Sequence, residues 1–262
     1  MATRATRTAS TLAAFVLHRY DWSETSVILD LFTREQGRLA VAAKGAKRPY
    51  SQLRSVLLPF QRLNVALGRV PKHDTSDTQA SEVQNLRSAE WAGGAAMLTG
   101  AALFSGFYLN ELLMKMMARH DPHPALFDVY AQTLPSLAAG DEQRVQAALR
   151  AFELTLLKEA GLLPDLSVVT LTPGDVDGAT SYALLPEAGV VAVRSGEAQL
   201  GGAALIGLQA ALDHGSLPAL QQACQPVLPE LKTMLRTLLH YHLGTPILRT
   251  RQVMLDVQNL ER

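Results

Sequence analysis

Residues 12–43 have the sequence LAAFVLHRYDWSETSVILDLFTREQGRLAVAA. Three short apolar runs lie in this stretch, at Ala14–Leu17, Ser26–Phe32 and Leu39–Ala43. Polar residues and glycine separate them, including Glu35-Gln36-Gly37 before the third run. Short apolar runs between turn-forming residues are typical of β-strands. The N-terminal part of the chain is therefore predicted to be β-structure.

Two further candidate strands follow, at Leu63–Leu67 and Glu82–Arg87. The polar stretch Lys72–Ser81 between them is predicted to be a long loop. Five short strands in about 80 residues favour a small barrel, with a small sandwich as the alternative. We therefore expect a five-stranded β-domain at residues 12–91, preceded by a disordered tail at residues 1–11.

The rest of the chain is predicted to be helical and then mixed, which makes the fold class α+β. In a helical domain at residues 92–161 we expect three helices, at Met97–Met117, Pro124–Leu137 and Asp141–Ala160. Residues 162–262 are expected to form a mixed C-terminal region that packs on the helical domain. Its predicted elements are a β-hairpin at about 181–194 and helices at Ala203–Leu212 and Val227–Leu243. The pattern of residues 247–262 does not distinguish a helix from a loop.

The formal net charge is zero, with 24 Lys and Arg against 24 Asp and Glu, but the charges are unevenly distributed. Residues 1–91 hold 13 basic and 8 acidic side chains, a balance of +5, whereas residues 92–161 and 162–262 have balances of −2 and −3. Within the first part, residues 34–69 hold eight basic side chains and one acid, Glu35. This local excess of +7 indicates an anionic partner for the β-domain.

Nucleic-acid phosphates fit this basic segment best. The turn Lys44–Pro49 combines three cations with a glycine, so its backbone can approach a phosphate chain closely. Tyr50 is the best candidate for stacking on a base, whereas Trp22 is interpreted as the anchor of a turn. The alternative is an ordinary solvated surface. The residues expected to bind nucleic acid are Arg34, Arg38, Lys44, Lys47, Arg48, Tyr50, Arg54, Arg62 and Arg69.

Known catalytic motifs are missing from the sequence. It contains no phosphate-binding P-loop, no dinucleotide-binding glycine turn and no nucleophile elbow. The single cysteine, Cys224, has no charged sequence neighbour that would lower its pKa, and is interpreted as a structural thiol. The seven histidines do not have metal-ligand spacing. We therefore expect no catalytic residue, no metal and no cofactor. No apolar run approaches the ~20 residues of a spanning helix, so no membrane contact is expected.

A set of short motifs, taken in order along the chain, is similar to the RecO family of bacterial recombination-mediator and DNA-annealing proteins. The motifs of the β-domain are Ala14–His18, Trp22–Ser26, Leu31–Thr33, Gly37-Arg38 and Ala43–Ala46. The later motifs are Leu86–Glu90, Gly106–Leu113 and Leu149–Leu154. Each motif alone is weak, and the similarity rests on their common order over most of the chain.

The resemblance implies an N-terminal OB-fold, a helical domain and a C-terminal region that carries a four-cysteine zinc module in many members. This sequence has Val169 and Thr172 where the first cysteine pair would be expected, and no cysteine near Ala192–Ser195. It therefore resembles the zinc-free proteobacterial members, in which apolar packing must hold the hairpin.

The resemblance also implies three kinds of partner. The first is single- and double-stranded DNA, bound by the basic OB-fold. The second is the C-terminal tail of single-stranded-DNA-binding protein, which is acidic and ends in phenylalanine. The third is RecR, with which the family loads RecA. A tail of this kind needs a cation beside an apolar pocket, and Arg150 with Leu154, Leu157 and Lys158 on the third helix has that chemistry. The alternative is that Arg150 only pairs with Glu153 or another acid.

The implied function is that of a non-enzymatic mediator of DNA repair and recombination, which acts in the cytoplasm at the nucleoid and promotes strand annealing. A protein-only adaptor that does not bind DNA is the alternative. A nucleotide-processing enzyme is a third interpretation, for which the sequence offers no candidate catalytic groups.

Overall fold

The computed structural model describes residues 11–68, 83–94, 97–138, 141–172, 174–193, 198–244 and 248–260. Contacts between residues divide the chain into two compact units. Unit 1 combines the residues up to Met97 with Met117–Phe127, and unit 2 combines Leu98–Met116 with Asp128–Arg262. Both units are therefore discontinuous in the sequence, and most of the predicted helical and C-terminal segments belong to the same unit.

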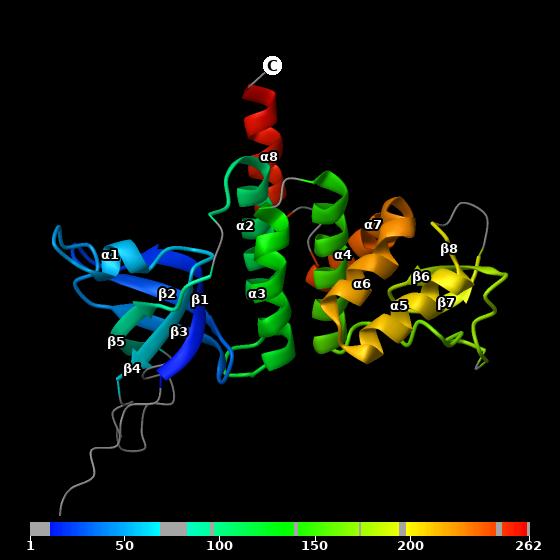
Figure 1. Ribbon diagram of the computed structural model, residues 1–262, viewed down its shortest axis with the longest axis horizontal. Coiled ribbons are helices and arrows are strands. Elements are labelled where there is room, and N and C mark those ends of the chain that lie inside the picture. Colours follow the sequence, from blue (N-terminus) through cyan, green and yellow to red (C-terminus); the bar gives the residue numbers. More distant parts are fainter. Residues whose placement is uncertain are drawn as a thin grey trace, which may run out of the picture. The chain divides into compact units, whose positions relative to one another are not determined.

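Unit 1 is built on a closed five-stranded barrel (Figure 1). Its strands are β1 (Thr11–Asp21), β2 (Val27–Thr33), β3 (Gly37–Ala43), β4 (Arg62–Leu67) and β5 (Val83–Trp91). They follow each other around the barrel in the order β1-β2-β3-β5-β4. The pair of β3 and β5 is parallel and the other pairs are antiparallel. The prediction of an OB-like five-stranded barrel is confirmed, and the sandwich alternative is wrong.

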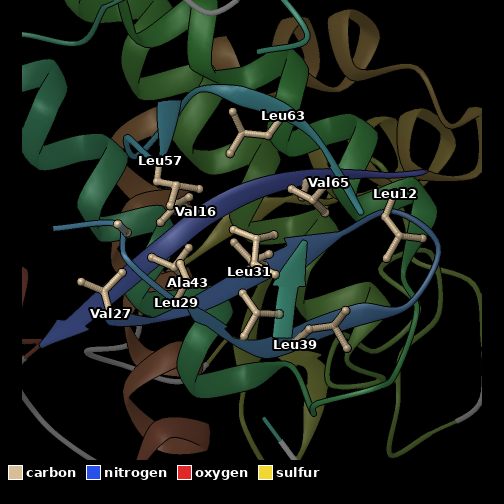
Figure 2. Close-up of a cluster of buried hydrophobic side chains, with 14 residues drawn as sticks. Leu12, Val16, Val27, Leu29, Leu31, Leu39, Ala43, Leu57, Leu63 and Val65 are labelled. Atoms are coloured by element: carbon tan, nitrogen blue, oxygen red, sulfur yellow. The ribbon is translucent and has the colours of Figure 1, made fainter. Parts of the chain in front are cut away.

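Alternate residues of the strands fill the barrel interior, because successive side chains of a strand point to opposite faces. Figure 2 shows leucine and valine side chains from β1 to β4 converging on this core, together with Leu57, which follows the short helix α1 (Leu53–Val56). Leu29, Leu31 and Val65 have no exposed surface. Burial of each such side chain stabilises the fold by about 1.5–3 kcal/mol.

The outer face of β1, β2 and β3 is partly covered by residues 117–127 of the same unit. Phe127, in the first turn of α3 (Pro124–Ala138), packs against Phe15 and Phe32 at ring-centroid distances of 5.2 and 5.5 Å. Gly37 has a φ of +68°, and a Cβ atom there would lie 2.0 Å from the carbonyl oxygen of Asp121. The segment therefore approaches the strands so closely that only glycine fits at residue 37.

Unit 2 consists of helices and a small sheet (Figure 1). Unit 2 includes α3 from residue 128 onward. Its other helices are α2 (Gly100–Met116), α4 (Glu142–Glu159), α5 (Gly202–His214), α6 (Leu217–Cys224), η1 (Gln225–Val227), α7 (Leu228–Leu243) and α8 (Arg249–Leu260). The sheet has the order β7-β6-β8, formed by β6 (Ser181–Leu185), β7 (Gly189–Ala192) and β8 (Leu200–Gly201). The sequence pattern misses α6 and β8, and leaves α8 undecided. No helix within the described ranges is long and apolar enough to cross a membrane.

Helix α4 is the central buried helix of unit 2. It begins at Asp141, whose carboxylate accepts a hydrogen bond from the backbone N–H of Gln143 at 3.0 Å. It ends just before Gly161, which has a φ of +69°. Ten consecutive or nearly consecutive residues between Ala147 and Leu157 are buried, so the helix is covered on almost all sides. Polar side chains on this helix therefore need partners within the protein.

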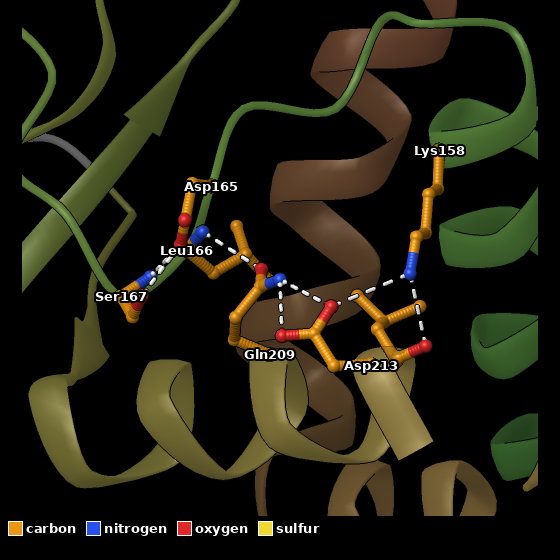
Figure 3. A network of polar contacts seen from close by, with 7 residues as sticks. Lys158, Asp165, Leu166, Ser167, Gln209 and Asp213 are labelled. Carbon is orange, nitrogen blue, oxygen red and sulfur yellow. Dashed lines mark hydrogen bonds and ion pairs between the residues drawn. The ribbon is translucent and has the colours of Figure 1, made fainter. Parts of the chain in front are cut away.

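A polar network joins α4 to α5 and to the loop that follows α4 (Figure 3). The Nζ of Lys158 donates a hydrogen bond to the carbonyl oxygen of Leu212 at 2.9 Å and lies 3.4 Å from Oδ1 of Asp213. Gln209 donates to the carboxylate of Asp213 and accepts a hydrogen bond from the backbone N–H of Leu166. Lys158 therefore holds the end of α4 against the end of α5.

Candidate nucleic-acid and peptide-binding sites

Most of the predicted nucleic-acid-binding cations lie on the surface of the barrel. Arg34 is exposed in the turn between β2 and β3, and Arg62 is exposed on β4. Lys44 and Arg48 are exposed in the turn after β3, and Arg54 is exposed on α1. Arg69 lies outside the described residues.

The turn after β3 is bonded to the turn between β1 and β2. The backbone N–H of Lys47 donates to the carbonyl oxygen of Thr25 at 3.0 Å, and Gly45 donates to Oγ of Ser26 at 3.3 Å. The Lys47 ammonium donates to the carbonyl oxygen of Ser23 at 2.9 Å and pairs with Asp21 at 2.7 Å. The hydrogen bond and charge of Lys47 lower the pKa of Asp21. Lys47 therefore fixes the position of the turn, while Lys44 and Arg48 extend from it into solvent.

Arg38 is placed among the phosphate-binding cations by the sequence, and this placement is wrong. Its side chain is only 8% exposed. Its Nε and Nη2 donate to the two carboxylate oxygens of Asp30 at 3.3 and 2.8 Å, and its Nη1 donates to the carbonyl oxygen of Met117 at 2.7 Å. Arg119 lies 3.6 Å from the same carboxylate. A guanidinium enclosed in this way stabilises the packing of residues 117–127 and does not reach a phosphate.

Exposed aromatic side chains lie near the basic turn. Tyr50, the predicted stacking residue, is 99% exposed. Trp22 is 54% exposed, and Tyr20 is 46% exposed and contacts the ring of His18 edge to face at 4.4 Å. The sequence predicts that the first strand ends at Leu17, whereas β1 continues to Asp21, so Tyr20 is an exposed aromatic residue of a longer strand. Aromatic residues beside cations in a hairpin are the sequence pattern that would indicate stacking on bases.

Unit 2 contains a cavity of about 230 Å³ between α2, α4, α7 and α8. Its apolar wall includes Phe104, Leu149, Leu239 and Met254. Its charged residues are the four cations Arg150, Lys232, Arg236 and Arg251 and the carboxylate of Glu153. The cavity therefore combines excess positive charge with an apolar surface large enough for part of a side chain.

A buried polar cluster forms the floor of this cavity. The Nη2 of Arg150 donates to Oε1 of Glu153 at 2.5 Å, and the hydroxyl of Tyr108 donates to the same oxygen at 2.6 Å. Burial raises the pKa of Glu153, and the charge of Arg150 opposes this shift. Burial and the neighbouring Glu153 raise the pKa of Tyr108 well above its ordinary value. Among the described residues, the buried Nε of Arg150 has no hydrogen-bond partner. An unsatisfied buried donor of this kind favours an anionic ligand.

The four residues that are predicted to bind an acidic peptide, Arg150, Leu154, Leu157 and Lys158, do not line one common site. Arg150 lines the cavity and also forms the ion pair with Glu153 that the alternative predicts. Leu154 and Leu157 are fully buried in the interior, and Lys158 is bonded to the end of α5. Leu154 and Leu157 are therefore not available to a peptide, whereas Lys158 is exposed but bonded to the end of α5. Lys232, Arg236 and Arg251, distant in the sequence, line the cavity together with Arg150.

His240 is the one histidine among the described residues that line the cavity. Burial lowers its pKa, and the positive charges of Arg236 and Arg251 lower it further. The imidazole is therefore predominantly uncharged at pH 7, and an anionic ligand would favour its protonation.

Other chemical groups of the described chain do not form a reactive centre. Cys224 is buried, and burial raises the pKa of its thiol to about 12, which keeps it protonated. Within the described ranges, no three His, Cys, Asp or Glu side chains are grouped so that they could hold a metal ion.

Two family models match the chain over most of its length. The model described as "Recombination protein O N terminal" matches residues 8–87, and the one described as "Recombination protein O C terminal" matches residues 97–252. The first covers β1 to β4 and the first part of β5, and the second covers α2, α4 and α7 and the start of α8.

Curated relatives give the same result. A "DNA repair protein RecO" from Albidiferax ferrireducens is 48% identical over 258 residues, covering 98% of this chain and 99% of the relative. The protein of that name from Polaromonas naphthalenivorans is 50% identical over 249 residues, covering 94% and 96% of the two chains. The one from Paracidovorax citrulli is 46% identical over 266 residues, covering 98% and 100%. The chain belongs to the RecO family of DNA repair proteins.

Proposed function

We propose that this chain is a non-enzymatic recombination mediator, which binds single- and double-stranded DNA through its barrel and the acidic tail of single-stranded-DNA-binding protein through the cavity of unit 2. It promotes the annealing of complementary strands and, with RecR, the loading of RecA. Because its substrate is chromosomal DNA, it acts in the cytoplasm at the nucleoid.

The turn of residues 44–50 is the observation that carries the DNA-binding part of the proposal. Lys44 and Arg48 are exposed on a turn whose backbone is already held by the turn between β1 and β2. Oligonucleotides commonly bind OB-folds at this first inter-strand loop and along strands 2 and 3. Arg34, Arg54 and Arg62 add exposed positive charge to the same barrel. Two complementary strands repel each other less when such cations neutralise their phosphates, which lowers the barrier to annealing.

The charge and shape of the cavity support the peptide-binding part. A tail that carries aspartates and a terminal phenylalanine needs cations for its carboxylates and an apolar recess for its ring. Arg236 and Arg251 supply exposed cations on two different helices, while Phe104 and Leu149 supply apolar surface. The guanidinium of Arg150, which also lines the cavity, adds a further positive charge for the terminal carboxylate.

The proposed mechanism involves no bond cleavage, and a cofactor has no part in it. The protein docks on the tail of the coating protein, holds exposed strands by their phosphates and brings them into contact. A measurement of the annealing of fluorophore- and quencher-labelled complementary strands, with and without single-stranded-DNA-binding protein, tests this. Acceleration that decreases as salt increases is expected. If annealing is not accelerated and DNA binding shows no salt dependence, the protein-only adaptor is the better description.

A further inference from the structure

The outer face of β1, β2 and β3 consists of three rows of paired residues. Residues that pair across antiparallel strands point to the same face of a sheet. The pairing defines the rows Phe15–Phe32–Arg38, His18–Asp30–Ala40 and Tyr20–Ile28–Ala42. This face is where OB-folds bind single strands, so its accessibility decides where DNA can lie on this barrel.

Residues 117–127 cover most of the first two rows, although His18 of the second row is exposed. Phe127 packs on Phe15 and Phe32, while the carbonyl oxygen of Met117 and the guanidinium of Arg119 meet the ion pair of Asp30 and Arg38. In the third row Tyr20 is 46% exposed and Ile28 is partly exposed, whereas Ala42 is buried. The open part of the face is therefore the end near the turn between β1 and β2.

Trp22 stands at this open end. Its side chain is 54% exposed, so much of the indole is accessible to a ligand. The turn itself is closed by backbone N–H groups of Trp22 and Ser23, which both donate to the carbonyl oxygen of Ser26, and by Oγ of Ser23, which accepts from Ser26. The indole is not part of these bonds, so a role as turn anchor does not account for it.

Cations lie directly beside this aromatic end. Lys47 bonds to the carbonyl oxygen of Ser23, the residue after Trp22, and its own turn carries Lys44 and Arg48. A groove that binds single strands combines cations for the backbone with aromatic faces for the bases. In a duplex the bases are already stacked on each other, so only the cations can be used.

We propose that Trp22, with Tyr20 beside it, stacks on an unpaired base while the turn of residues 44–50 holds the adjoining phosphates, so that this barrel prefers single-stranded to double-stranded DNA. The proposal rests on the DNA binding proposed above and adds the origin of strand preference. The cations bind both forms of DNA, and the indole contributes only to the binding of unpaired strands.

Tryptophan fluorescence provides a direct test, because the chain has two tryptophans, Trp22 and Trp91. In the variant Trp91→Phe, Trp22 is the only indole. Titration with an oligothymidine strand is expected to quench its emission strongly, and titration with a duplex of equal length is expected to quench it little. Equal quenching by both forms, or quenching by neither, would overturn the proposal.

Affinity measurements with the full chain complete the test. Trp22→Ala should weaken binding of oligothymidine about tenfold, as expected for the loss of one stacked base, and leave duplex affinity unchanged. Trp22→Phe should restore part of the loss. Trp91→Ala is the matched control, because Trp91 is 63% exposed and its Nε1 bonds to Gln61, on another part of the barrel. An equal loss in Trp91→Ala, or an equal loss of duplex binding in Trp22→Ala, would contradict the assignment.

The two proposals fail in different ways. If the unchanged protein binds neither form of DNA, the proposed function of the barrel is wrong. If the unchanged protein binds both forms and Lys44→Ala/Arg48→Ala weakens both, but Trp22→Ala leaves their ratio unchanged, only the stacking proposal is wrong.

Discussion

The carboxylate of Glu111 accepts two hydrogen bonds from Thr250, one from its backbone N–H at 2.8 Å and one from its hydroxyl at 2.5 Å. The backbone N–H of Arg249 donates to the other carboxylate oxygen at 2.9 Å. Glu111 belongs to α2, and these bonds satisfy the first N–H groups of α8. Arg251 and Met254 of α8 line the cavity, so Glu111 helps to position these two side chains by holding the start of α8.

Glu111→Gln should therefore loosen α8 and weaken the binding of an acidic peptide that ends in phenylalanine. The amide keeps one acceptor but loses the charge, so we expect a decrease of about 1–2 kcal/mol in the free energy of unfolding. Urea denaturation and fluorescence anisotropy of a labelled peptide measure the two effects. If Glu111 acts through Arg251, Glu111→Gln should reduce peptide affinity less in the Arg251→Ala variant than in the unchanged protein. If the two residues act independently, the two losses of binding free energy should add.

The same contact makes the stability of α8 dependent on pH. Burial alone would raise the pKa of Glu111, but the hydrogen bonds from Thr250 and Arg249 and the charge of Lys115 lower it below its ordinary value. A carboxyl group with a lowered pKa stabilises the fold above its ordinary pKa, and this contribution disappears as the pH falls through the lowered value. The difference in stability between the unchanged protein and Glu111→Gln should be constant near neutral pH and shrink below about pH 4. A difference that does not shrink at all as the pH is lowered from neutral through the acid range would contradict this role.

The exposed cations of the cavity should determine peptide affinity with little effect on folding. Arg236→Ala and Arg251→Ala are each expected to weaken peptide binding about five- to tenfold, with a smaller dependence on salt. Arg150→Ala should abolish binding, but it also leaves the buried Glu153 without its cation, which costs about 3–5 kcal/mol of stability. Arg144→Ala, which removes an exposed cation of α4 paired with Asp141, is the matched control. Peptide affinity that survives in both Arg236→Ala and Arg251→Ala would place the peptide elsewhere.

Peptide binding should become tighter as the pH is lowered from about 7.5 to 6, because His240 then gains a positive charge. Burial and the charges of Arg236 and Arg251 hold the pKa of His240 below its ordinary value in the free protein, and an acidic peptide opposes these charges. Glu153, Lys232 and Tyr108 also line the cavity, so the assignment to His240 needs a variant. His240→Gln should bind with the same affinity at both pH values. If this variant keeps the pH dependence, another group of the cavity titrates.

The number of DNA phosphates that the basic turn neutralises can be measured from salt dependence. Lys44→Ala/Arg48→Ala should weaken DNA binding and reduce the slope of log K against log salt by about 1.4 on single strands, or 0.7 for each lost phosphate contact. Lys47 is kept in this variant because it holds the turn through Ser23 and Asp21. Arg144→Ala, in unit 2, controls for loss of positive charge. An unchanged slope would remove this turn from the DNA-binding surface.

The barrel could be predicted from the sequence because its signal is local. Its strands are short apolar runs, such as Ser26–Phe32 and Leu39–Ala43, and turn-forming residues separate them, so neighbouring residues suffice to identify them. The short helices α6 and α8 could not be predicted with the same success. Their stability depends on packing against other elements, as α8 shows through its contact with Glu111, more than one hundred residues earlier in the chain.

The candidate sites depended on information that a linear pattern does not contain. Arg38 resembles Lys44 in the sequence, but Met117 and Asp30 enclose only Arg38. In the sequence Leu154 and Leu157 look like residues of an exposed second face of the helix. A helical pattern does not show that the middle of α4 is buried on almost all sides. Lys232, Arg236 and Arg251 line the cavity from α7 and α8. Only the tertiary fold brings these helices next to Arg150.

The packing of Phe127 on Phe15 and Phe32 has a consequence for synthesis of the protein. Unit 1 is discontinuous, so the strands of the barrel leave the ribosome before the residues that cover their outer face. Until residue 127 has emerged, two phenylalanine rings remain in water and the buried ion pair of Asp30 and Arg38 lacks the carbonyl oxygen of Met117. A nascent chain that stops at residue 97 therefore contains all five strands but exposes an apolar surface. Such a surface promotes aggregation with other incomplete chains.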